Sequence, residues 1–63
     1  MKFAKNLALL RKSAGFTQQQ LADILNVSFQ TVSHWEHGYC EPSLSQQIQL
    51  KEIFAVSYEE LLD

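Results

Sequence analysis

Residues Thr17–Glu36, TQQQLADILNVSFQTVSHWE, decide the fold of this chain because they carry the start signals of two short helices. Thr17 and Gln20 have the spacing of a capping box, in which each side chain bonds a free backbone N–H at a helix start. Ser28 precedes a second apolar pattern in the same way. Asn26, between the two patterns, is a residue type that can take the positive φ of a tight turn. The stretch therefore predicts two helices joined by a short turn.

The first of these predicted helices runs from about Gln18 to Leu25, and the second from about Phe29 to Glu36 or His37. Ala22 lies in the middle of the first helix, where a bulky side chain would push the second helix away. The apolar side chains that can meet in a shared interior are Leu21, Leu25, Val27, Val32 and Trp35. Such a pair of helices is a helix-turn-helix, here with its core over residues 17–36.

The chain resembles the helix-turn-helix domain of the Cro and phage-repressor type, the xenobiotic-response-element family. The resemblance rests on the pattern Q-x-x-L-A-x-x-L-x-V-S-x-x-T-V-S-x-W-E-x-G, which runs from Gln18 to Gly38. It begins near Leu7 and continues through Pro42–Leu44 and Ile53–Leu62. It implies an all-α fold of the lambda-repressor-like class, a compact five-helix bundle that forms one domain over residues 1–63.

Three further helices are expected around this core. The first runs from Lys2 or Phe3 to Ser13 and ends at Gly15, with apolar positions at Phe3, Leu7, Leu10 and Ala14. Capping boxes predict the other two, one opened by Ser43 with Gln46 and one over 58–62 opened by Ser57 with Glu60.

The helix after Ser43 has the least regular pattern. Its expected apolar positions are Leu44, Ile48, Leu50 and Phe54. Gln47 and Lys51 fall where the resembled family has apolar or small residues, and Ala55 stands where a glycine is usual. We expect Lys51 to lay its aliphatic stem along the core with its ammonium in water. The last helix offers Tyr58, Leu61 and Leu62 either as a lid on the core, the favoured reading, or as a dimer contact.

The formal net charge of −2 is unusual for a nucleic-acid binder, because Lys and Arg normally supply the contacts to phosphate. The charge is polarised along the chain. Four of the five cations, Lys2, Lys5, Arg11 and Lys12, lie in the first twelve residues, and no Lys or Arg occurs from Ser13 to Leu50. The central helices therefore present a neutral, polar surface.

No apolar run is long enough for a signal peptide or a membrane span, so the cytoplasm is the expected location, at the nucleoid when DNA is bound. Cys40 is the single cysteine, which excludes an internal disulfide. No glycine-rich phosphate loop, carboxylate pair or nucleophile with a base partner stands at a workable spacing, and we therefore expect no enzyme and no cofactor.

Arg11 has two interpretations. It is either a solvated cation that favours the C-terminal end of its helix dipole or, as the resemblance implies, the partner of Glu36 in an ion pair. We favour the ion pair, which would fix the angle between the first and third helices and serve specificity more than stability.

The third helix separates into two faces at helical periodicity. Val32 and Trp35 fall on the inner side, and the outer side is suited to reading bases in the major groove. Its candidate base contacts are Phe29, Gln30, Ser33 and His34. Gln30 matches the bidentate pattern for adenine and Phe29 can lie on a thymine methyl. The alternative for Phe29 is a ring folded back over Val27 or the next helix.

Candidate phosphate contacts flank this helix. The helix start at Gln18 and Gln19 presents free backbone amides, which suit an anion, and the resemblance implies a phosphate contact for Gln18. By the same resemblance His37 and Tyr39 touch phosphate, as neutral donors at neutral pH. A metal site at His34, His37 and Cys40 is a less favoured alternative, because a structural zinc ion needs four ligands.

Together these features predict a sequence-specific, double-stranded DNA-binding transcriptional regulator, with repression favoured over activation. It is expected to work as a homodimer on a pseudo-palindromic operator. The alternative is a protein-interaction or antitoxin-like module that keeps the fold, which the acidic balance would suit.

Overall fold

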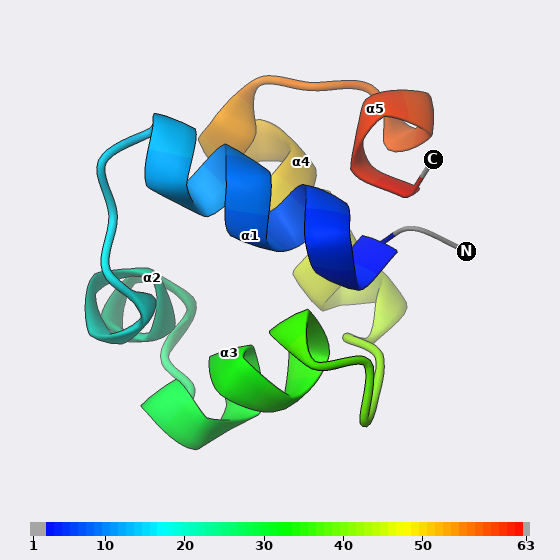
Figure 1. The fold of residues 1–63 in the computed structure, drawn as a ribbon. Helices are drawn as coiled ribbons and strands as arrows, with labels where there is room; N and C mark the ends of the chain where they lie inside the picture. Colours follow the sequence, from blue (N-terminus) through cyan, green and yellow to red (C-terminus); the bar gives the residue numbers. More distant parts are fainter. Residues whose placement is uncertain (1–2, 63) are drawn as a thin grey trace.

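The structure is a computed structural model that describes residues 3–62. Over that range the chain forms α1 (Phe3–Ser13), α2 (Gln18–Leu25), α3 (Phe29–Glu36), α4 (Leu44–Phe54) and α5 (Tyr58–Leu62), as Figure 1 shows. The prediction of an all-α, five-helix fold is confirmed. Lys2, the other expected start of the first helix, lies outside the described residues.

Each predicted capping box is present. The Gln20 N–H donates to Thr17 Oγ1 over 3.0 Å, and the Thr17 N–H donates to Gln20 Oε1 over 2.8 Å. The same reciprocal bonds join Ser43 to Gln46 and Ser57 to Glu60. Local sequence therefore sets where α2, α4 and α5 begin.

Four helices are followed by a residue in the left-handed region, one of them α3, after which Gly38 has φ +76°. Gly15 ends α1 with φ +82°, Asn26 ends α2 with φ +57°, and Ala55 ends α4 with φ +54°. At Asn26 the chain turns directly into the Ser28 cap of α3, so the helix-turn-helix has the short connection that its sequence predicts. Ala55 takes the same conformation with a Cβ, which is strained for an alanine.

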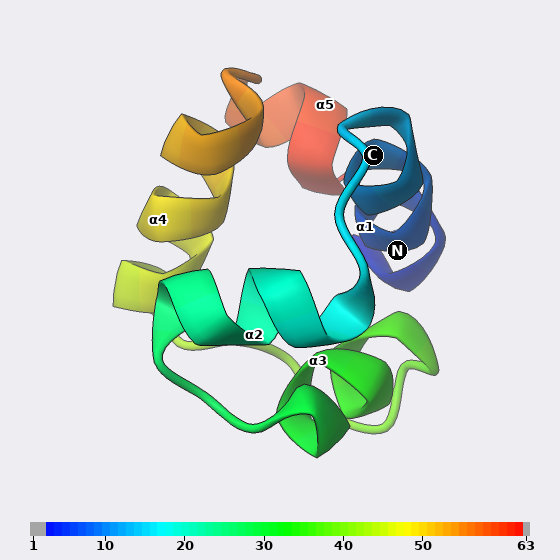
Figure 2. The same ribbon diagram turned by 90° about the vertical axis from the view of Figure 1, so that its left-hand side faces the viewer.

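The core lies where α1, α2 and α3 meet and is closed by α4 and α5. Its fully or almost fully buried side chains are Phe3, Leu7, Leu21, Ala22, Leu25, Val32, Trp35, Leu50 and Leu61. Val27 and Leu10 pack against it while partly buried, whereas Ala14 is exposed and was wrongly expected on the inner face. In both views α2 and α3 form one end of the molecule, and α5 lies at the other (Figures 1 and 2).

The predicted inner face of α4 is wrong in two positions. Leu44 exposes 67% of its surface and Ile48 exposes 39%, whereas Leu50 is fully buried. The Gln47 amide donates to the carbonyl of the buried Pro42 over 3.2 Å, which directs this polar side chain inward. Ile48 then lies about 100° further around the helix, beyond the contact with the core.

The lid interpretation of α5 holds for Leu61, which is fully buried, and for Leu62, which packs against the core. Tyr58 is partly exposed, and the Lys51 Nζ lies 4.6 Å from the centre of its ring. Lys51 therefore keeps its ammonium at the surface as expected, and the aromatic ring gives it a partner there.

Candidate nucleic-acid interface

The two faces of α3 are as different in the structure as in the sequence. Val32 and Trp35 are buried, with 0% and 2% of their surface exposed. Gln30 and His34 are exposed, Ser33 is partly buried, and Phe29 exposes 47% of its surface without joining the core. A half-exposed phenylalanine at the start of a helix is available to a ligand, and its ring is not folded into the interior.

Phe29, Gln30 and His34 thus form a row of exposed side chains on the outer face of α3. Four candidate base contacts stand on this helix, which is short and is braced on its inner side by α1 and α2. A braced helix with a free polar face has the shape that enters a major groove. Their contacts with bases remain a prediction.

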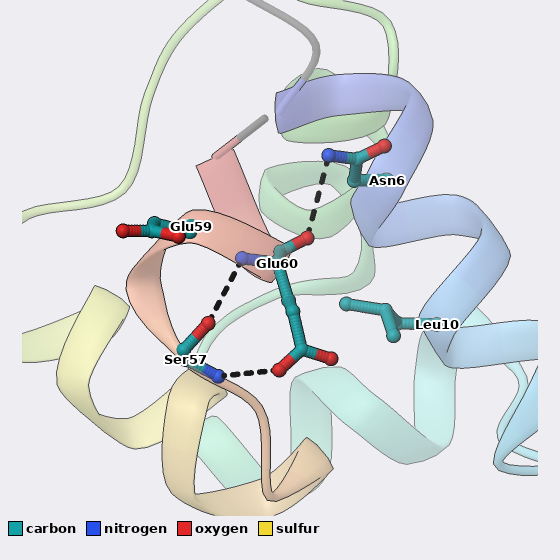
Figure 3. A pocket seen from close by; sticks show the side chains of 5 residues that line it. All are labelled: Asn6, Leu10, Ser57, Glu59 and Glu60. Atoms are coloured by element: carbon teal, nitrogen blue, oxygen red, sulfur yellow. Dashed lines mark hydrogen bonds between the residues drawn. The ribbon is translucent and has the colours of Figure 1, made fainter.

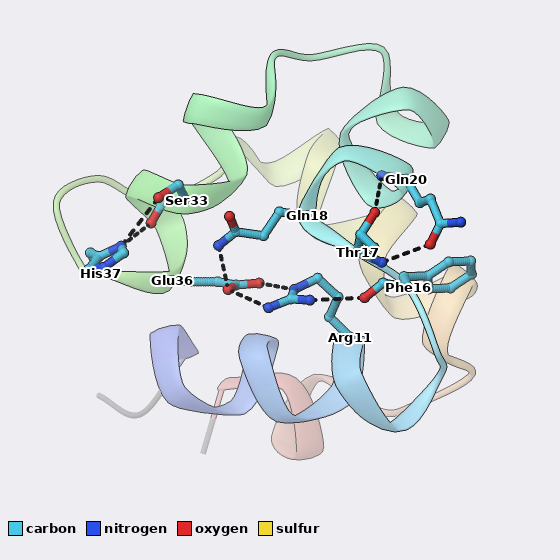
Figure 4. A network of polar contacts seen from close by, with 8 residues as sticks. All are labelled: Arg11, Phe16, Thr17, Gln18, Gln20, Ser33, Glu36 and His37. Carbon is cyan, nitrogen blue, oxygen red and sulfur yellow. Dashed lines mark hydrogen bonds and ion pairs between the residues drawn. The ribbon is translucent and has the colours of Figure 1, made fainter.

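The start of α2 lies beside the end of α3. The Gln18 Nε2 donates to Glu36 Oε1 over 3.0 Å, which fixes this proximity (Figure 4). Gln18 and Gln19 are the first two residues of α2, so their backbone N–H groups have no acceptor within the helix, and the Thr17 cap serves the N–H of Gln20. These two amides can receive an anion.

Both glutamine side chains are partly committed within the protein. Gln18 uses one amide hydrogen on Glu36, and Gln19 uses one on Asp23 Oδ1 over 2.8 Å. An amide has two such hydrogens, so each side chain keeps one for a phosphate. The phosphate contacts of Gln18 and Gln19 remain predictions, for which each side chain keeps one amide hydrogen.

Arg11 and Glu36 form the ion pair that the resemblance implies. The Arg11 Nε donates to Glu36 Oε2 over 2.6 Å and the Nη2 donates to Oε1 over 3.1 Å, a bidentate arrangement. The Arg11 Nη1 also donates to the Phe16 carbonyl over 2.9 Å. The two side chains expose 10% and 6% of their surface, and among residues 3–62 no buried side-chain nitrogen or oxygen lacks a hydrogen-bond partner. The pair therefore ties α1 to the end of α3.

A group of three aromatic rings lies at the end of α3 and in the loop after it. The rings of His37 and Tyr39 stack with centroids 5.6 Å apart and planes 19° apart. The ring of His34 meets Tyr39 at its edge, 5.8 Å between centroids. Tyr39 exposes 75% of its surface, so its hydroxyl is open to a phosphate. The contacts of His37 and Tyr39 with phosphate remain predictions.

One detail of the sequence expectation for His37 needs correction. The His37 Nδ1 lies 2.7 Å from the Ser33 carbonyl oxygen and 3.4 Å from the Ser33 Oγ. A carbonyl only accepts hydrogen bonds, so Nδ1 carries the hydrogen, and neutral His37 has none left on Nε2. While this bond to Ser33 is kept, the neutral imidazole offers Nε2 as an acceptor and not as a donor to phosphate.

The described residues contain no group of three or more His, Cys, Asp or Glu side chains that could hold a metal ion. His34 and His37 instead contact Tyr39, and Cys40 is exposed. No helix within residues 3–62 has the length and hydropathy of a membrane span.

The opposite end of the molecule is unsuited to DNA. A surface hollow of about 640 Å³ between α1 and α5 is lined by Asn6, Leu10, Ser57, Glu59 and Glu60 (Figure 3). Two of these five residues are acidic and would repel a phosphate backbone. This contrast leaves the neutral surface of α2 and α3 as the candidate interface.

The family follows from comparison with known proteins. A family model described as helix-turn-helix, of the Cro/C1 type, matches residues 7–61. The chain belongs to this family. The matched residues include α2, α3 and both partners of the Arg11–Glu36 ion pair, so the candidate interface lies within the residues that the family model matches.

Several proteins are similar to this chain. It is 37% identical over 62 residues to the HTH-type transcriptional activator BcrR of Enterococcus faecalis, covering 98% of this chain and 30% of BcrR. It is 32% identical over 62 residues to the HTH-type transcriptional regulator ImmR of Bacillus subtilis, covering 98% of this chain and 49% of ImmR. The chain thus spans about half, or less, of the length of these relatives.

The crystal structure of a transcriptional regulator from Listeria innocua has the same fold. Its TM-score is 0.88 at 37% sequence identity, and the match covers 94% of this chain and 55% of that one.

Sequence reasoning missed two contacts of the interface. The Gln18 bond to Glu36 joins residues on different helices, and no spacing or periodicity connects them. The bond from His37 to Ser33 has a signal, because residues four apart on a helix lie one above the other. That spacing could have shown that the imidazole reaches back along α3.

Proposed function

We propose that this chain binds double-stranded DNA through α2 and α3 and regulates transcription, with α3 in the major groove. The observation that carries the proposal is the outer face of α3, where Phe29, Gln30 and His34 are exposed on a helix fixed by the buried Arg11–Glu36 pair. The similarity to proteins named transcriptional regulators supports it.

Within this proposal Gln30 reads a base and Phe29 lies against a thymine methyl, while Ser33 and His34 add further contacts. Phosphates are held by the start of α2, at Gln18 and Gln19, and by the loop after α3. Contacts on both sides of the groove orient the helix, and contacts within the groove select the sequence.

The proposed working form is a homodimer on a pseudo-palindromic operator, since one short helix reads too few bases for a specific site. Repression is the proposed direction, because occupying a promoter is sufficient for it, whereas activation needs a further contact with the transcription machinery. The proposed location is the cytoplasm, at the nucleoid.

Selection from a random pool of DNA duplexes tests the proposal. We expect enrichment of a two-fold symmetric sequence, and Gln30→Ala should lose about 1–3 kcal/mol of discrimination at one base position in each half-site. Gln49→Ala is the matched control, because Gln49 is an exposed glutamine on α4. Equal weakening of Gln30→Ala on all sequences would refute base reading by this residue.

The same experiment distinguishes DNA binding from the alternative function in protein interaction. A protein-interaction or antitoxin-like module would enrich no sequence and would bind a protein partner through a defined surface. An electrophoretic shift with the enriched duplex, beside a pull-down from cell extract, distinguishes the two outcomes.

A further inference from the structure

The imidazole of His37 is oriented by a single carbonyl. The Ser33 carbonyl oxygen receives the His37 backbone N–H over 3.0 Å and the His37 Nδ1 over 2.7 Å. Figure 4 shows the ring turned back along α3 toward Ser33. Because the carbonyl has no hydrogen to give, the bond requires the hydrogen on Nδ1, and Nε2 is the free nitrogen of the ring.

This bond determines what Nε2 can do. In the neutral imidazole one nitrogen donates and the other accepts, so the neutral ring offers only a lone pair at Nε2. A phosphate diester oxygen also offers only lone pairs, and the two groups repel. When the ring is protonated, Nε2 gains an N–H and the imidazole gains a positive charge, so the same contact becomes a charge-assisted hydrogen bond.

Within the described residues His37 has no carboxylate partner that would stabilise a second proton on its ring. Among the described residues no carboxylate lies within 4.0 Å of the imidazole of His34 or His37. The charged group that α1 brings to α3 is Arg11, which Glu36 holds, and the residue that α2 brings is the neutral Gln18. On its own element and loop His37 stacks on the ring of Tyr39, whose other neighbour is His34, and Glu41 is exposed.

The end of α3 favours a cation. His37 is the C-cap residue of this helix, where the carbonyl dipoles present partial negative charge. Among the described residues no anionic side chain is a partner of the ring there. A phosphate would supply that partner.

We infer that His37 binds a DNA phosphate as an imidazolium, so that each monomer takes up a proton when it binds DNA. The inference rests on the proposed function and adds a charge to an interface that has almost none of its own. It makes DNA affinity depend on pH through one residue, by up to tenfold per pH unit where the free ring is neutral.

Calorimetric titration at pH 7.5 tests the inference, with the duplex enriched from the random pool and two buffers of different ionisation enthalpy at equal ionic strength. We expect net proton uptake on DNA binding by the wild type. His37→Gln keeps a neutral donor and should abolish the uptake. His34→Gln is the matched control, since no hydrogen bond of the described residues fixes the hydrogen of His34, and it should keep the uptake whatever its affinity.

The outcomes separate the inference from the proposed function. DNA binding without proton uptake, or uptake that survives in His37→Gln, would overturn the inference alone. Failure to bind any duplex would overturn both. A measurement on the free protein adds an independent test: nitrogen chemical shifts of His37 above pH 8 should show a protonated Nδ1 and an unprotonated Nε2, and the opposite tautomer would overturn the inference.

Discussion

The ion pair between Arg11 and Glu36 predicts strong coupling between the two residues. The pair has two direct bonds, of 2.6 and 3.1 Å, and its side chains expose only 10% and 6% of their surface. Removing one partner leaves the other charge buried and unpaired, which costs about 3–5 kcal/mol. An exposed pair would contribute only about 0.2–1 kcal/mol.

We therefore expect Arg11→Met and Glu36→Met each to lower the free energy of unfolding by about 3 kcal/mol. The double variant should cost no more than either single change, because it removes both charges and leaves apolar side chains of similar length. The coupling free energy would then be about 3 kcal/mol. Urea denaturation followed by the fluorescence of the buried Trp35 measures all four proteins.

The domain is small, so a loss of about 3 kcal/mol is a large fraction of its total free energy of unfolding. At roughly 0.05–0.15 kcal/mol per residue, a chain of this length has a total stability of roughly 3–9 kcal/mol, so the single variants fall near the unfolding threshold and the double variant stays folded. Lys12→Met, an exposed cation one position away on α1, is the control and should change stability by less than about 0.5 kcal/mol. Additive losses in the double variant would refute the argument that burial makes this pair interdependent.

Three further predictions follow from the packing and charge. Ala55→Gly should raise the free energy of unfolding by about 0.5–1 kcal/mol, since it relieves the strain at φ +54°. Gly15→Ala, at φ +82°, should lower the free energy of unfolding by about 1 kcal/mol. Thermal melts of the two variants that change in the same direction would contradict this argument. Trp35→Ala should cost about 3–5 kcal/mol through the cavity it leaves, and circular dichroism of that variant should show little helix. The logarithm of the DNA association constant should fall with the logarithm of salt concentration at a slope of no more than about three per monomer. Each cationic contact with a phosphate contributes close to one unit to this slope. A slope twice as steep would mean that other residues contact the DNA backbone.

Sequence alone predicted those parts of the fold that depend on near neighbours. A capping box spans four residues, and the boxes at Thr17, Ser43 and Ser57 each begin a helix in the structure. The left-handed turn at Asn26 is likewise a property of one residue and its flanks. These signals fix where helices start and end, whatever the rest of the chain does.

The orientation of α4 was not predictable in this way. Leu44 and Ile48 have the side chains of a core face, but the helix is rotated so that Gln47 and Leu50 point inward. In this rotation Gln47 bonds the Pro42 carbonyl and Leu50 is fully buried in the core. Both are tertiary properties, and hydrophobic periodicity along one helix contains neither.

The candidate site, too, was predictable only where it depends on near neighbours in the sequence. The exposed side chains of α3 could be predicted because periodicity separates them from Val32 and Trp35. The resemblance, not the spacing, implied the pair of Arg11 with Glu36. Only the structure shows that one Gln18 amide hydrogen is donated to Glu36 and that the His37 ring bonds the Ser33 carbonyl.

The charge of the interface follows from how the fold uses its cations. Arg11 contacts α3 directly, and the protein holds this cation in a buried pair with Glu36, so its hydrogen bonds are used within the fold. The part of the proposed DNA surface formed by α2, α3 and the loop after α3 offers amides, a phenol and imidazoles, whose hydrogen bonds depend on direction more than those of a free ammonium do. Weak attraction to any phosphate lowers binding to random DNA, and discrimination between sites rises as that background falls. An interface poor in charge is therefore consistent with a regulator that relies on the fit of α3 to its sequence, with the proton on His37 as the adjustable part of its affinity.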